Sequence, residues 1–550
     1  MTDAQSPQRL LTPSKVTAWL DCPHYLTLKH RQERGEITVP DGRGGEFAQL
    51  LMHKGMEHER ACLADYWANG KSVFEVPQRG HAESFESWVS RVGDAMADGH
   101  HVIYQMPFIH DGMRGIADFL IRCDLPDGSF TYEPLDAKLA RGEAKPGHVL
   151  QLCFYADAIE ASGLPAPTDV HVWLGSGMVE SIRLGEVRAY WRRLRRQLRA
   201  VMEAEPQDEA TTPVKCSHCD FCEFSELCTA EWRAADSLQF VAGIRAAERQ
   251  LLEAGGVGTM AALATNSAEI NDLRPPRRAR LTAQAQLQVR AREMPDVSVP
   301  PYHSLPDPMP EEEQAGLVAL PEPDDGDVFL DYEGHPFWRA DAGLFFLFGL
   351  LTKGDGGQWV YEARWAHSKG EEAAQAKALI EYFDQRRLQH PGMHVYHYNH
   401  PERSGLEAMA AEHGVDQGLL QELIEGGLFV DLLPVVRNSL QAGVESYGLK
   451  WIERLTGYER SHDIERGAGA VVEYERWTHD HNADSLVHIA AYNEDDVRAT
   501  HALRNWLLDL RDPGAVRRPP AAPREKSDHR KALDELVASS KLTVTTPSSS

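Results

Sequence analysis

Apolar and polar residues alternate in two neighbouring stretches of the chain, which predicts a β-hairpin. The stretches are residues 115–123 and 129–140, and a Pro-Asp-Gly turn separates them. Asp118 falls in the first predicted strand, whereas Asp136 and Lys138 lie near the end of the second, two residues apart and therefore on one face. The pattern thus gathers two carboxylates and an ammonium group on one hairpin.

Further elements are predicted on both sides of this hairpin. A helix is expected over residues 42–70, where glycines open it and an Asn-Gly pair ends it. A strand is predicted at 101–109, a second helix at 147–162 and another strand at 169–175. The order of helix, three strands, helix and strand indicates a mixed α/β domain.

A second group of predicted strands follows a proline-rich segment. Asp331 and Glu333 lie two apart in an apolar strand and therefore share one face. Two more strands are predicted within 345–366, then a helix at 370–388, a strand at 394–399 and further helices. This strand-strand-strand-helix-strand-helix order resembles that of an RNase H-like fold.

The length of the chain indicates more than one domain. Its 550 residues are too many for a single core, so at least two domains with a linker are expected. Residues 295–326 are proline-rich and acidic and indicate that linker, and the composition from residue 513 onward predicts a disordered tail. Apolar runs stay well short of the roughly 20 residues that span a bilayer, and the first residues lack a signal-peptide core. A cytoplasmic location is expected.

The formal net charge of -26 argues against a general polyanion binder, although it leaves room for a local basic track. Two groups of arginines could form such a track. They are Arg188, Arg192, Arg193, Arg195, Arg196 and Arg199 on one predicted helix, and Arg277, Arg278 and Arg280 further on. Either a solvated helix face or a nucleic-acid contact would account for them.

Cysteine usage favours a metal site. The chain has eight cysteines and looks cytosolic, which disfavours a disulfide framework. Cys219, Cys222 and Cys228 crowd together, and a fourth ligand could come from Cys22, which precedes a proline near the amino terminus. Alternatively, Cys216 could complete a local quartet that holds zinc tetrahedrally.

The hairpin acids resemble a known nuclease core. Asp118 followed by Asp136-Ala137-Lys138 is similar to the PD-(D/E)xK pattern, and Gln151 with Tyr155 matches the QxxxY of RecB-type members. A carboxylate pair of this kind holds a divalent cation, and the lysine orients or deprotonates a water. Residues 55–59 resemble the GxxHE element of the same family. The resemblance implies a catalytic Mg or Mn site that uses His58, Asp118, Asp136 and Lys138 together with Gln151 and Tyr155.

The cysteines resemble those of AddB-type and RecB-like iron-sulfur nucleases, which place one cysteine before a proline near the amino terminus and three after the nuclease core. The resemblance implies a [4Fe-4S] cluster held by Cys22, Cys219, Cys222 and Cys228 that joins the two ends of the nuclease domain. Its role is expected to be structural.

The acids of the second group of strands, with Tyr492 and Asp496 further on, resemble those of the DEDDy exonucleases, specifically the YprB-type ribonuclease H-like domain. That resemblance implies two metal ions held by four carboxylates, with Asp331, Glu333 and Asp496 among them and Tyr492 positioning the attacking water. Glu402 is the choice for the fourth acid. Asp431 is the reserve. Residues 445–460 are similar to a SLKxIE segment of the same family, for which a packing role is favoured over a substrate contact.

The sequence therefore predicts an α/β protein with an N-terminal restriction-endonuclease-like domain and a C-terminal RNase H-like domain. A glycine turn at 255–258 resembles a helix-hairpin-helix element, whose amides meet DNA phosphates. The predicted parts are 10–230 for the RecB-like domain, 231–294 for the helical segment, 295–326 for the linker, 327–512 for the YprB-type domain and 513–550 for the tail.

The predicted function is metal-dependent hydrolysis of DNA, with single-stranded ends as substrate, in repair, recombination or defence. An RNA-directed nuclease remains an alternative because the sequence does not show how a 2′-hydroxyl would be read. A non-catalytic nucleic-acid scaffold is the other. The chain contains no GxxxxGK[ST] motif, so any unwinding is expected to come from a helicase partner in trans.

Overall fold

The computed structural model describes residues 11–39, 45–203, 211–266, 269–295, 297–306, 315–399, 401–461 and 467–514. It divides into two compact units. Unit 1 comprises Met1–Gln239, Glu333–Phe345 and Ile464–Ile489, and unit 2 comprises Phe240–Tyr332, Phe346–Asp463 and Ala490–Ser550. Residues 307–314 of the predicted linker and 515–550 of the predicted tail lie outside the described residues.

The described part of unit 1 is built on a six-stranded sheet with the order β1-β2-β3-β4-β5-β6. β3 is antiparallel to β2 and β4, and β4 runs parallel to β5. The central hairpin was predicted, but the edge strands β1 and β6 were not, because both are short and only partly buried. The strands are β1 Val73–Glu75, β2 Val102–His110, β3 Met113–Asp124, β4 Phe130–Lys138, β5 Asp169–Leu174 and β6 Val179–Arg183.

Helices cover this sheet. α5 is apolar on all sides between Val149 and Ile159, so it is buried, and it packs against β2, β4 and β5. α3 packs on β4, where Cys62 and Leu63 join Phe119 in one apolar cluster. The helices are α1 Pro13–Asp21, α2 His24–Glu33, α3 Gly45–Ala68, α4 Phe85–Val92, α5 Pro146–Ala161, α6 Leu184–Glu203, α7 Ser225–Ala234 and α16 Gly467–Asp480.

A buried ionic cluster lies between α3 and α16 in unit 1. Glu475 is 2.7 Å from Lys54 Nζ and 3.0 Å from His335 Nε2. Burial acts to raise the pKa of Glu475, but hydrogen bonds from His335 and Lys54 lower it to about 2. The carboxylate is therefore held ionised by its two partners.

The described part of unit 2 is built on a five-stranded sheet with the order β10-β9-β8-β11-β12. β9 and β10 form an antiparallel hairpin, whereas β11 runs parallel to both β8 and β12. Its strands are β8 Val328–His335, β9 Leu344–Lys353, β10 Trp359–Trp365, β11 Val395–His397 and β12 Phe429–Asp431; β7 Tyr302–Ser304 and β13 Leu440–Ala442 pair separately.

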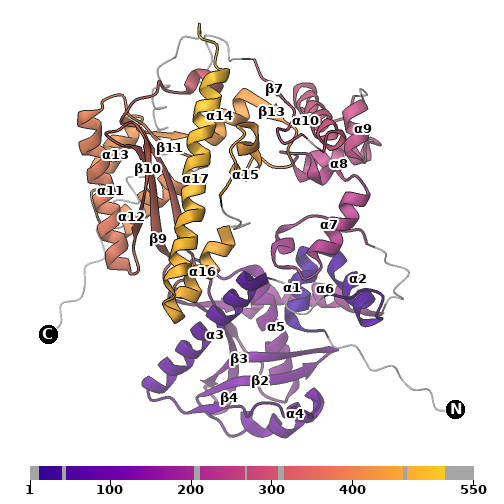
Figure 1. The fold of residues 1–550 in the computed structure, drawn as a ribbon. Coiled ribbons are helices and arrows are strands. Elements are labelled where there is room, and N and C mark those ends of the chain that lie inside the picture. Colours follow the sequence, from indigo (N-terminus) through magenta and orange to yellow (C-terminus); the bar gives the residue numbers. More distant parts are fainter. Residues whose placement is uncertain are drawn as a thin grey trace, which may run out of the picture. The chain divides into compact units, whose positions relative to one another are not determined.

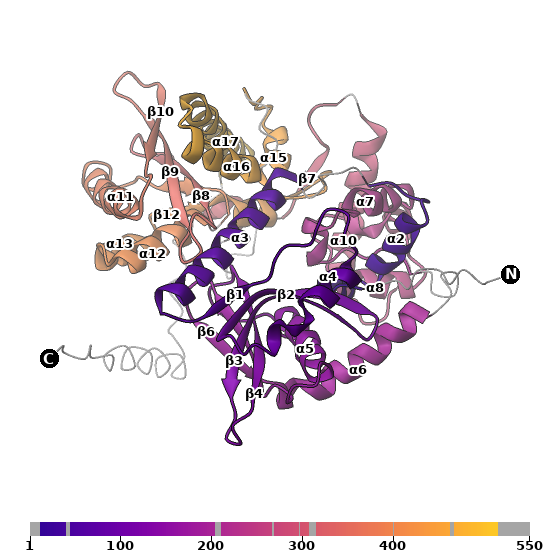
Figure 2. The ribbon, with the colours of Figure 1, turned by 90° about the horizontal axis from the view of Figure 1, so that it is seen from below.

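The helices α11 to α13 lie on one side of the five-stranded sheet and α17 lies on the other, as Figure 1 and Figure 2 both show. The predicted order of three strands, helix, strand and helix is the observed order β8-β9-β10-α11-β11-α12. These helices and their neighbours are α11 Lys369–Gln389, α12 Pro401–His413, α13 Gln417–Glu425, α14 Leu432–Ser439, α15 Leu449–Ile452 and α17 Ala483–Leu510.

One buried ion pair anchors α17 in unit 2. Arg504 Nη1 lies 2.6 Å from Asp327 Oδ2, and the two side chains are 3% and 0% exposed. The guanidinium group also lies over the rings of Phe329 and Tyr396. Charge, hydrogen bonds and aromatic contacts thus fix one end of the helix to the start of β8.

The helical segment before the sheet contains α8 Ala246–Ala254, α9 Met260–Thr265 and α10 Pro275–Glu293. α8 and α9 flank the predicted glycine turn, in which Gly256 has a φ of 81°. None of the described helices is long and apolar enough to cross a membrane.

Candidate active sites

The acids of the first predicted site lie on adjacent strands of unit 1. Lys138 Nζ is 2.7 Å from Asp136 Oδ2, and Asp118 Oδ2 accepts a hydrogen bond of 3.1 Å from the backbone N–H of Ala137. Burial raises the pKa of Asp118 well above its usual range, and the charge of Asp136 adds to this rise. Burial also opposes ionisation of Asp136, but Lys138 lowers its pKa. Asp136 therefore carries a negative charge, whereas Asp118 is a carboxyl group that a bound cation would ionise.

Helix α5 places Tyr155 beside these acids. Its hydroxyl donates a 2.7 Å hydrogen bond to the carbonyl of Ile116 on β3, and its pKa is raised by burial and by the charges of Asp136 and Asp118. Gly115 makes this approach possible, because a Cβ there would lie 2.9 Å from the tyrosine oxygen. Gln151 lies one turn earlier on α5 and is partly buried.

Two further side chains of the first site were not predicted. His148, in the first turn of α5, has its pKa lowered to about 4 by burial and by the charge of Lys138. Glu59 hydrogen-bonds Tyr104 and adds to the rise in the pKa of Asp118. Glu59 belongs to the predicted GxxHE element, but only the fold shows which of its residues faces the acids.

His58 of α3 is buried, and its Nε2 lies 3.3 Å from the backbone carbonyl of Trp173 on β5. Within the described residues, His58, Asp118 and Asp136 do not form a close three-ligand group. The structure thus brings the two acids and Lys138 together, whereas the His58 imidazole contacts the neighbouring strand.

The cysteines predicted to share a site come from two distant parts of unit 1. Cys22 ends α1, while Cys219 and Cys222 lie on and after the short 3-10 helix Ser217–Phe221, against which α1 packs. Burial raises the pKa of Cys222 to about 11 and that of Cys228 to about 12, and in both cases Cys22 contributes. The packing of α1 on this 3-10 helix thus brings Cys22 to the same part of unit 1 as Cys219 and Cys222.

Cys216 also lies close to this group. Its Sγ is 3.9 Å from the Sγ of Cys219, and its backbone N–H donates to that sulfur at 3.4 Å. Tyr25 and Lys29 of α2 both reach Glu223, which ties the helix after Cys22 to the cysteine-rich segment. Within the described residues, however, no three of these cysteine sulfurs lie within 4.8 Å of one another, so the structure brings the cysteine segments together without forming a close ligand group.

The acids of the second predicted site form a compact group. Asp331 and Glu333 on β8 and Asp496 on α17 offer carboxylate oxygens that all lie within 4.8 Å of one another. Asn493, one turn before Asp496, donates a 2.7 Å hydrogen bond to Asp331 Oδ2 and accepts one of 2.9 Å from the hydroxyl of Tyr361. The carboxylates are thus close together, and a buried amide that the sequence motif did not include orients Asp331.

Room for that amide depends on a glycine in the neighbouring strand. Gly349 of β9 has no side chain, and a Cβ built there would lie only 1.6 Å from Asn493 Oδ1. Asn493 itself is fully buried, at 0% exposure. Gly349 is therefore required for the observed position of Asn493.

Two cations approach Asp496 from the segment after β13. Arg460 Nη2 is 2.6 Å from Asp496 Oδ1, and the same guanidinium donates two 2.7 Å hydrogen bonds to Glu453. Burial raises the pKa of Asp496, whereas Arg460 and Lys450 oppose that rise. Lys450 Nζ lies 4.8 Å over the ring of Tyr492, which is buried beside the acids. The segment predicted as a packing element thus also supplies charge at the site.

The predicted fourth acid does not join the group of three. Glu402 of α12 is buried and lies 3.3 Å from His397 Nδ1, and its charge helps to raise the pKa of Tyr332. The reserve candidate, Asp431, caps α14: it accepts hydrogen bonds from the backbone N–H groups of Leu433 and Asn399. Asp431 therefore has a structural task here.

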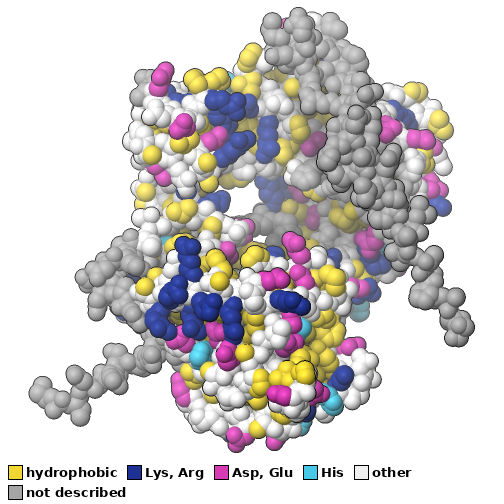
Figure 3. Space-filling view, turned by 180° about the vertical axis from the view of Figure 1, so that it is seen from behind, with side chains coloured by type: hydrophobic (Ala, Val, Ile, Leu, Met, Phe, Trp, Pro, Cys, Tyr) yellow, Lys and Arg dark blue, Asp and Glu magenta, His cyan; other side chains and the backbone are white. Residues whose placement is uncertain are grey.

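The arginines of α6 divide into two sets. Arg188, Arg195 and Arg199 pair with Glu160, Asp157 and Asp111 of unit 1. Arg192, Arg193 and Arg196 are exposed on the outer face, and Figure 3 shows a dense group of basic side chains where this helix crosses the surface. Half of the predicted basic helix is thus available to an anionic partner.

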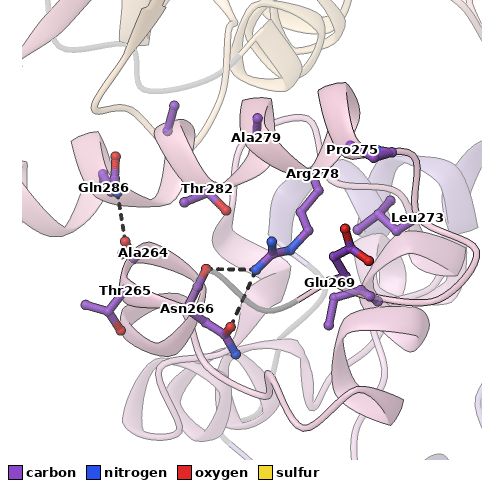
Figure 4. Close-up of a pocket in the computed structure, with 12 residues that line it drawn as sticks. Ala264, Thr265, Asn266, Glu269, Leu273, Pro275, Arg278, Ala279, Thr282 and Gln286 are labelled. Carbon is purple, nitrogen blue, oxygen red and sulfur yellow. Dashed lines mark hydrogen bonds between the residues drawn. The ribbon is translucent and has the colours of Figure 1, made fainter.

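The second arginine group is mostly engaged within unit 2. Arg277 forms two hydrogen bonds of 2.7 and 2.8 Å with Glu248. Arg278 reaches across a pocket of about 660 Å³ to the backbone carbonyl of Asn266, as Figure 4 shows. Arg280 keeps its guanidinium exposed, although one N–H donates to the carbonyl of Arg437.

Another acidic group, Glu372, Glu412 and His413, also brings ligand atoms together in unit 2. Here Lys369 contacts both glutamates, and His413 Nε2 is 2.7 Å from Glu372. A cation thus already pairs with both glutamates, and the group forms a contact between α11 and α12.

One part of the chain matches a known protein family. Residues 328–508 match a family described as RNase H superfamily. A comparison with curated proteins gave no match. The matched residues contain the sheet β8 to β12, α17 and the acidic group of Asp331, Glu333 and Asp496. The C-terminal part of this chain is therefore an RNase H-like domain with a nuclease-type fold.

Proposed function

We propose that the protein is a Mg- or Mn-dependent nuclease that hydrolyses phosphodiester bonds of DNA, acting on single-stranded ends in repair, recombination or defence. The observation that carries this proposal is the group of Asp331, Glu333 and Asp496 inside the RNase H-like domain. Oxygen ligands of this kind suit hard divalent cations.

The residues of the RNase H-like site have separate tasks in this proposal. The three carboxylates would hold the ions, which would stabilise the charge that develops on the phosphate. Asn493 orients Asp331, and Tyr492 positions the attacking water. Glu402 remains the proposed fourth acid, provided that its side chain turns from His397 toward the group.

A second active site is proposed in unit 1, as in RecB-like nucleases. Asp118 and Asp136 would hold a cation there, and His58 would join them if its ring left the Trp173 carbonyl. Lys138 lies 2.7 Å from Asp136, where it can orient a water or neutralise a developing charge. Tyr155 and Gln151 line the same region from α5.

Cleavage of end-labelled DNA and RNA strands with Mg or Mn tests both sites. Asp331→Ala is expected to lower activity of the RNase H-like site by more than about 100-fold, because loss of a metal ligand costs more than loss of a supporting group. Asp495→Asn is its matched control, since Asp495 is the neighbour of Asp496 but bonds to Tyr458 and Ser461 instead.

Asp136→Ala is the corresponding variant of unit 1, with Asp124→Asn at the exposed end of β3 as its control. Equal cleavage by wild type, Asp136→Ala and Asp331→Ala would contradict the proposal for both sites. A preference for RNA over the matched DNA strand would instead support an RNA-directed nuclease.

The cysteine region is proposed to hold a [4Fe-4S] cluster through Cys22, Cys219, Cys222 and Cys228. The support is the packing of α1, which ends at Cys22, against the 3-10 helix that carries Cys219, together with the affinity of thiolates for such clusters. In anaerobically prepared protein, Cys22→Ser should lose iron while Cys216→Ser retains it. Zinc that is lost from Cys216→Ser but retained by Cys22→Ser would refute the cluster.

A further inference from the structure

A cavity of about 450 Å³ in unit 2 is lined by four arginines. Arg245 precedes α8, Arg277 and Arg280 lie in the first turns of α10, and Arg437 lies near the end of α14. Glu445 is the acidic residue of the lining. Ser446 and Tyr447, from the segment after β13, complete one wall. We refer to this feature as the arginine cavity.

The cavity keeps most of its positive charge. Arg277 is neutralised by its two hydrogen bonds to Glu248. Arg280 donates to the backbone carbonyl of Arg437, a contact that leaves its charge unpaired. Arg245 and Arg437 are exposed, and the charge of Arg245 acts on Glu248 alongside that of Arg277. Four arginines of the lining are thus set against two glutamates, Glu248 and Glu445, which leaves the cavity with a net positive charge.

The charges act on the interior of the cavity. Burial raises the pKa of Tyr447, and the charges of Arg280 and Arg437 oppose that rise, so both guanidinium groups lie near the tyrosine. Guanidinium groups around an open cavity suit phosphate oxygens, which they bind through paired N–H donors.

The arginine cavity lies close to the acids of the RNase H-like site. Tyr447 lines the cavity, and Lys450, only three residues further on, has its Nζ 4.8 Å from the ring of Tyr492. Three residues span at most about 11 Å. A strand with a phosphate in the cavity would therefore reach the acids within a few nucleotides.

We propose that the arginine cavity binds the phosphodiester backbone of a single nucleic-acid strand and guides its end toward Asp331, Glu333 and Asp496. The choice of a single strand rests on the proposed function, and the binding itself does not require cleavage. Contacts to phosphates give affinity without sequence preference, which suits a nuclease that acts on ends.

Binding of a fluorescent oligothymidylate, measured by anisotropy in EDTA over a series of salt concentrations, tests this proposal. Removing both charges in Arg280→Gln/Arg437→Gln should weaken binding by roughly tenfold and reduce the slope of log K against log salt by about 1.4, since each phosphate contact on a single strand contributes about 0.7. Arg437→Gln alone should give half of that change in slope, and it leaves the contact made by the Arg280 side chain in place.

The matched control is Lys353→Gln/Lys377→Gln, which removes the same charge from two surface lysines of unit 2 that lie outside the cavity lining. An equal loss in the control and the cavity variant would overturn the proposal, as would an unchanged slope. Competition by inorganic phosphate as strong as that by unlabelled oligothymidylate would mean that the cavity takes a free anion, which also refutes a strand site.

The two proposals fail in different ways. If wild type binds the strand through the cavity but cuts nothing, the nuclease proposal fails and the cavity assignment holds. If Asp331→Ala abolishes cleavage while the cavity variants bind and cut as wild type does, the cavity assignment alone fails. In cleavage, the cavity variants should raise KM and leave kcat unchanged.

Discussion

Gly349→Ala should disrupt the acidic group of the RNase H-like domain without touching any acid. The new methyl group would lie 1.6 Å from Asn493 Oδ1, 2.8 Å from its Cγ and 3.1 Å from Cε2 of Tyr361. Asn493 is fully buried, so its amide cannot move into solvent and must leave its place. Both of its hydrogen bonds, to Asp331 and from Tyr361, would be lost.

The size of the effect follows from these contacts. Overpacking of a filled core costs about 1–3 kcal/mol. The bond to the Asp331 carboxylate is worth about 1.5–3 kcal/mol and the bond from Tyr361 about 1 kcal/mol. Gly349→Ala should therefore lower the free energy of unfolding by roughly 3.5–7 kcal/mol, measured by urea unfolding, and should reduce cleavage at this site.

A second substitution separates the clash from general damage. In Gly349→Ala/Asn493→Ala the obstructing amide is gone, so the double variant should be more stable than Gly349→Ala, with a coupling of about 1–3 kcal/mol in the cycle. Cleavage by the double variant should stay low because Asp331 still lacks the hydrogen bond from Asn493. Gly55→Ala on α3, where nothing lies within 4 Å, should instead stabilise the protein by about 0.5–1 kcal/mol. Additive losses in the cycle would refute this reasoning.

Other predictions concern charges in both units. Arg460→Gln removes the cation beside Asp496, so less Mn should be needed for half-maximal cleavage, and an unchanged Mn requirement would contradict this competition. Glu475→Gln should cost about 3 kcal/mol of unfolding free energy at pH 7, because the pKa of Glu475 falls from 4.5 to about 2 on folding. The stabilisation by Glu475 should be full above pH 4.5 and should disappear as the pH falls to 2. A loss that does not depend on pH would refute this prediction. Arg504→Met leaves the buried Asp327 without its cation and should lower the free energy of unfolding in urea by about 3–5 kcal/mol. A loss below about 1 kcal/mol would contradict the buried ion pair.

Elements with strong periodicity were predictable from the sequence. The predicted helix 370–388 is α11 Lys369–Gln389, and the hairpin that carries Asp118 and Asp136 is β3 and β4. Alternation and apolar runs determine such elements locally. The edge strands β1 and β6 escaped notice because each gains its partner only in the folded sheet.

Side chains at the sites were predictable only where a motif carries them. Asp331 and Glu333 share a face because positions two apart on a strand do, and Asp496, which only the resemblance implied, lies beside them. Asn493 and Arg460 were missed because their role depends on contacts with elements distant in sequence. Glu402 was chosen for its position, where the exonuclease pattern has an aspartate, but it lies against His397 because packing, which spacing does not show, determines its side-chain position.

The most direct test of the central claim is single-turnover cleavage of an end-labelled single strand by wild type and by Asp136→Ala/Asp331→Ala with Mn. The account predicts cleavage by wild type that EDTA abolishes, with the double variant reduced to the EDTA level. Cleavage by the double variant at the wild-type rate would contradict it, since the reaction would then use neither acidic site.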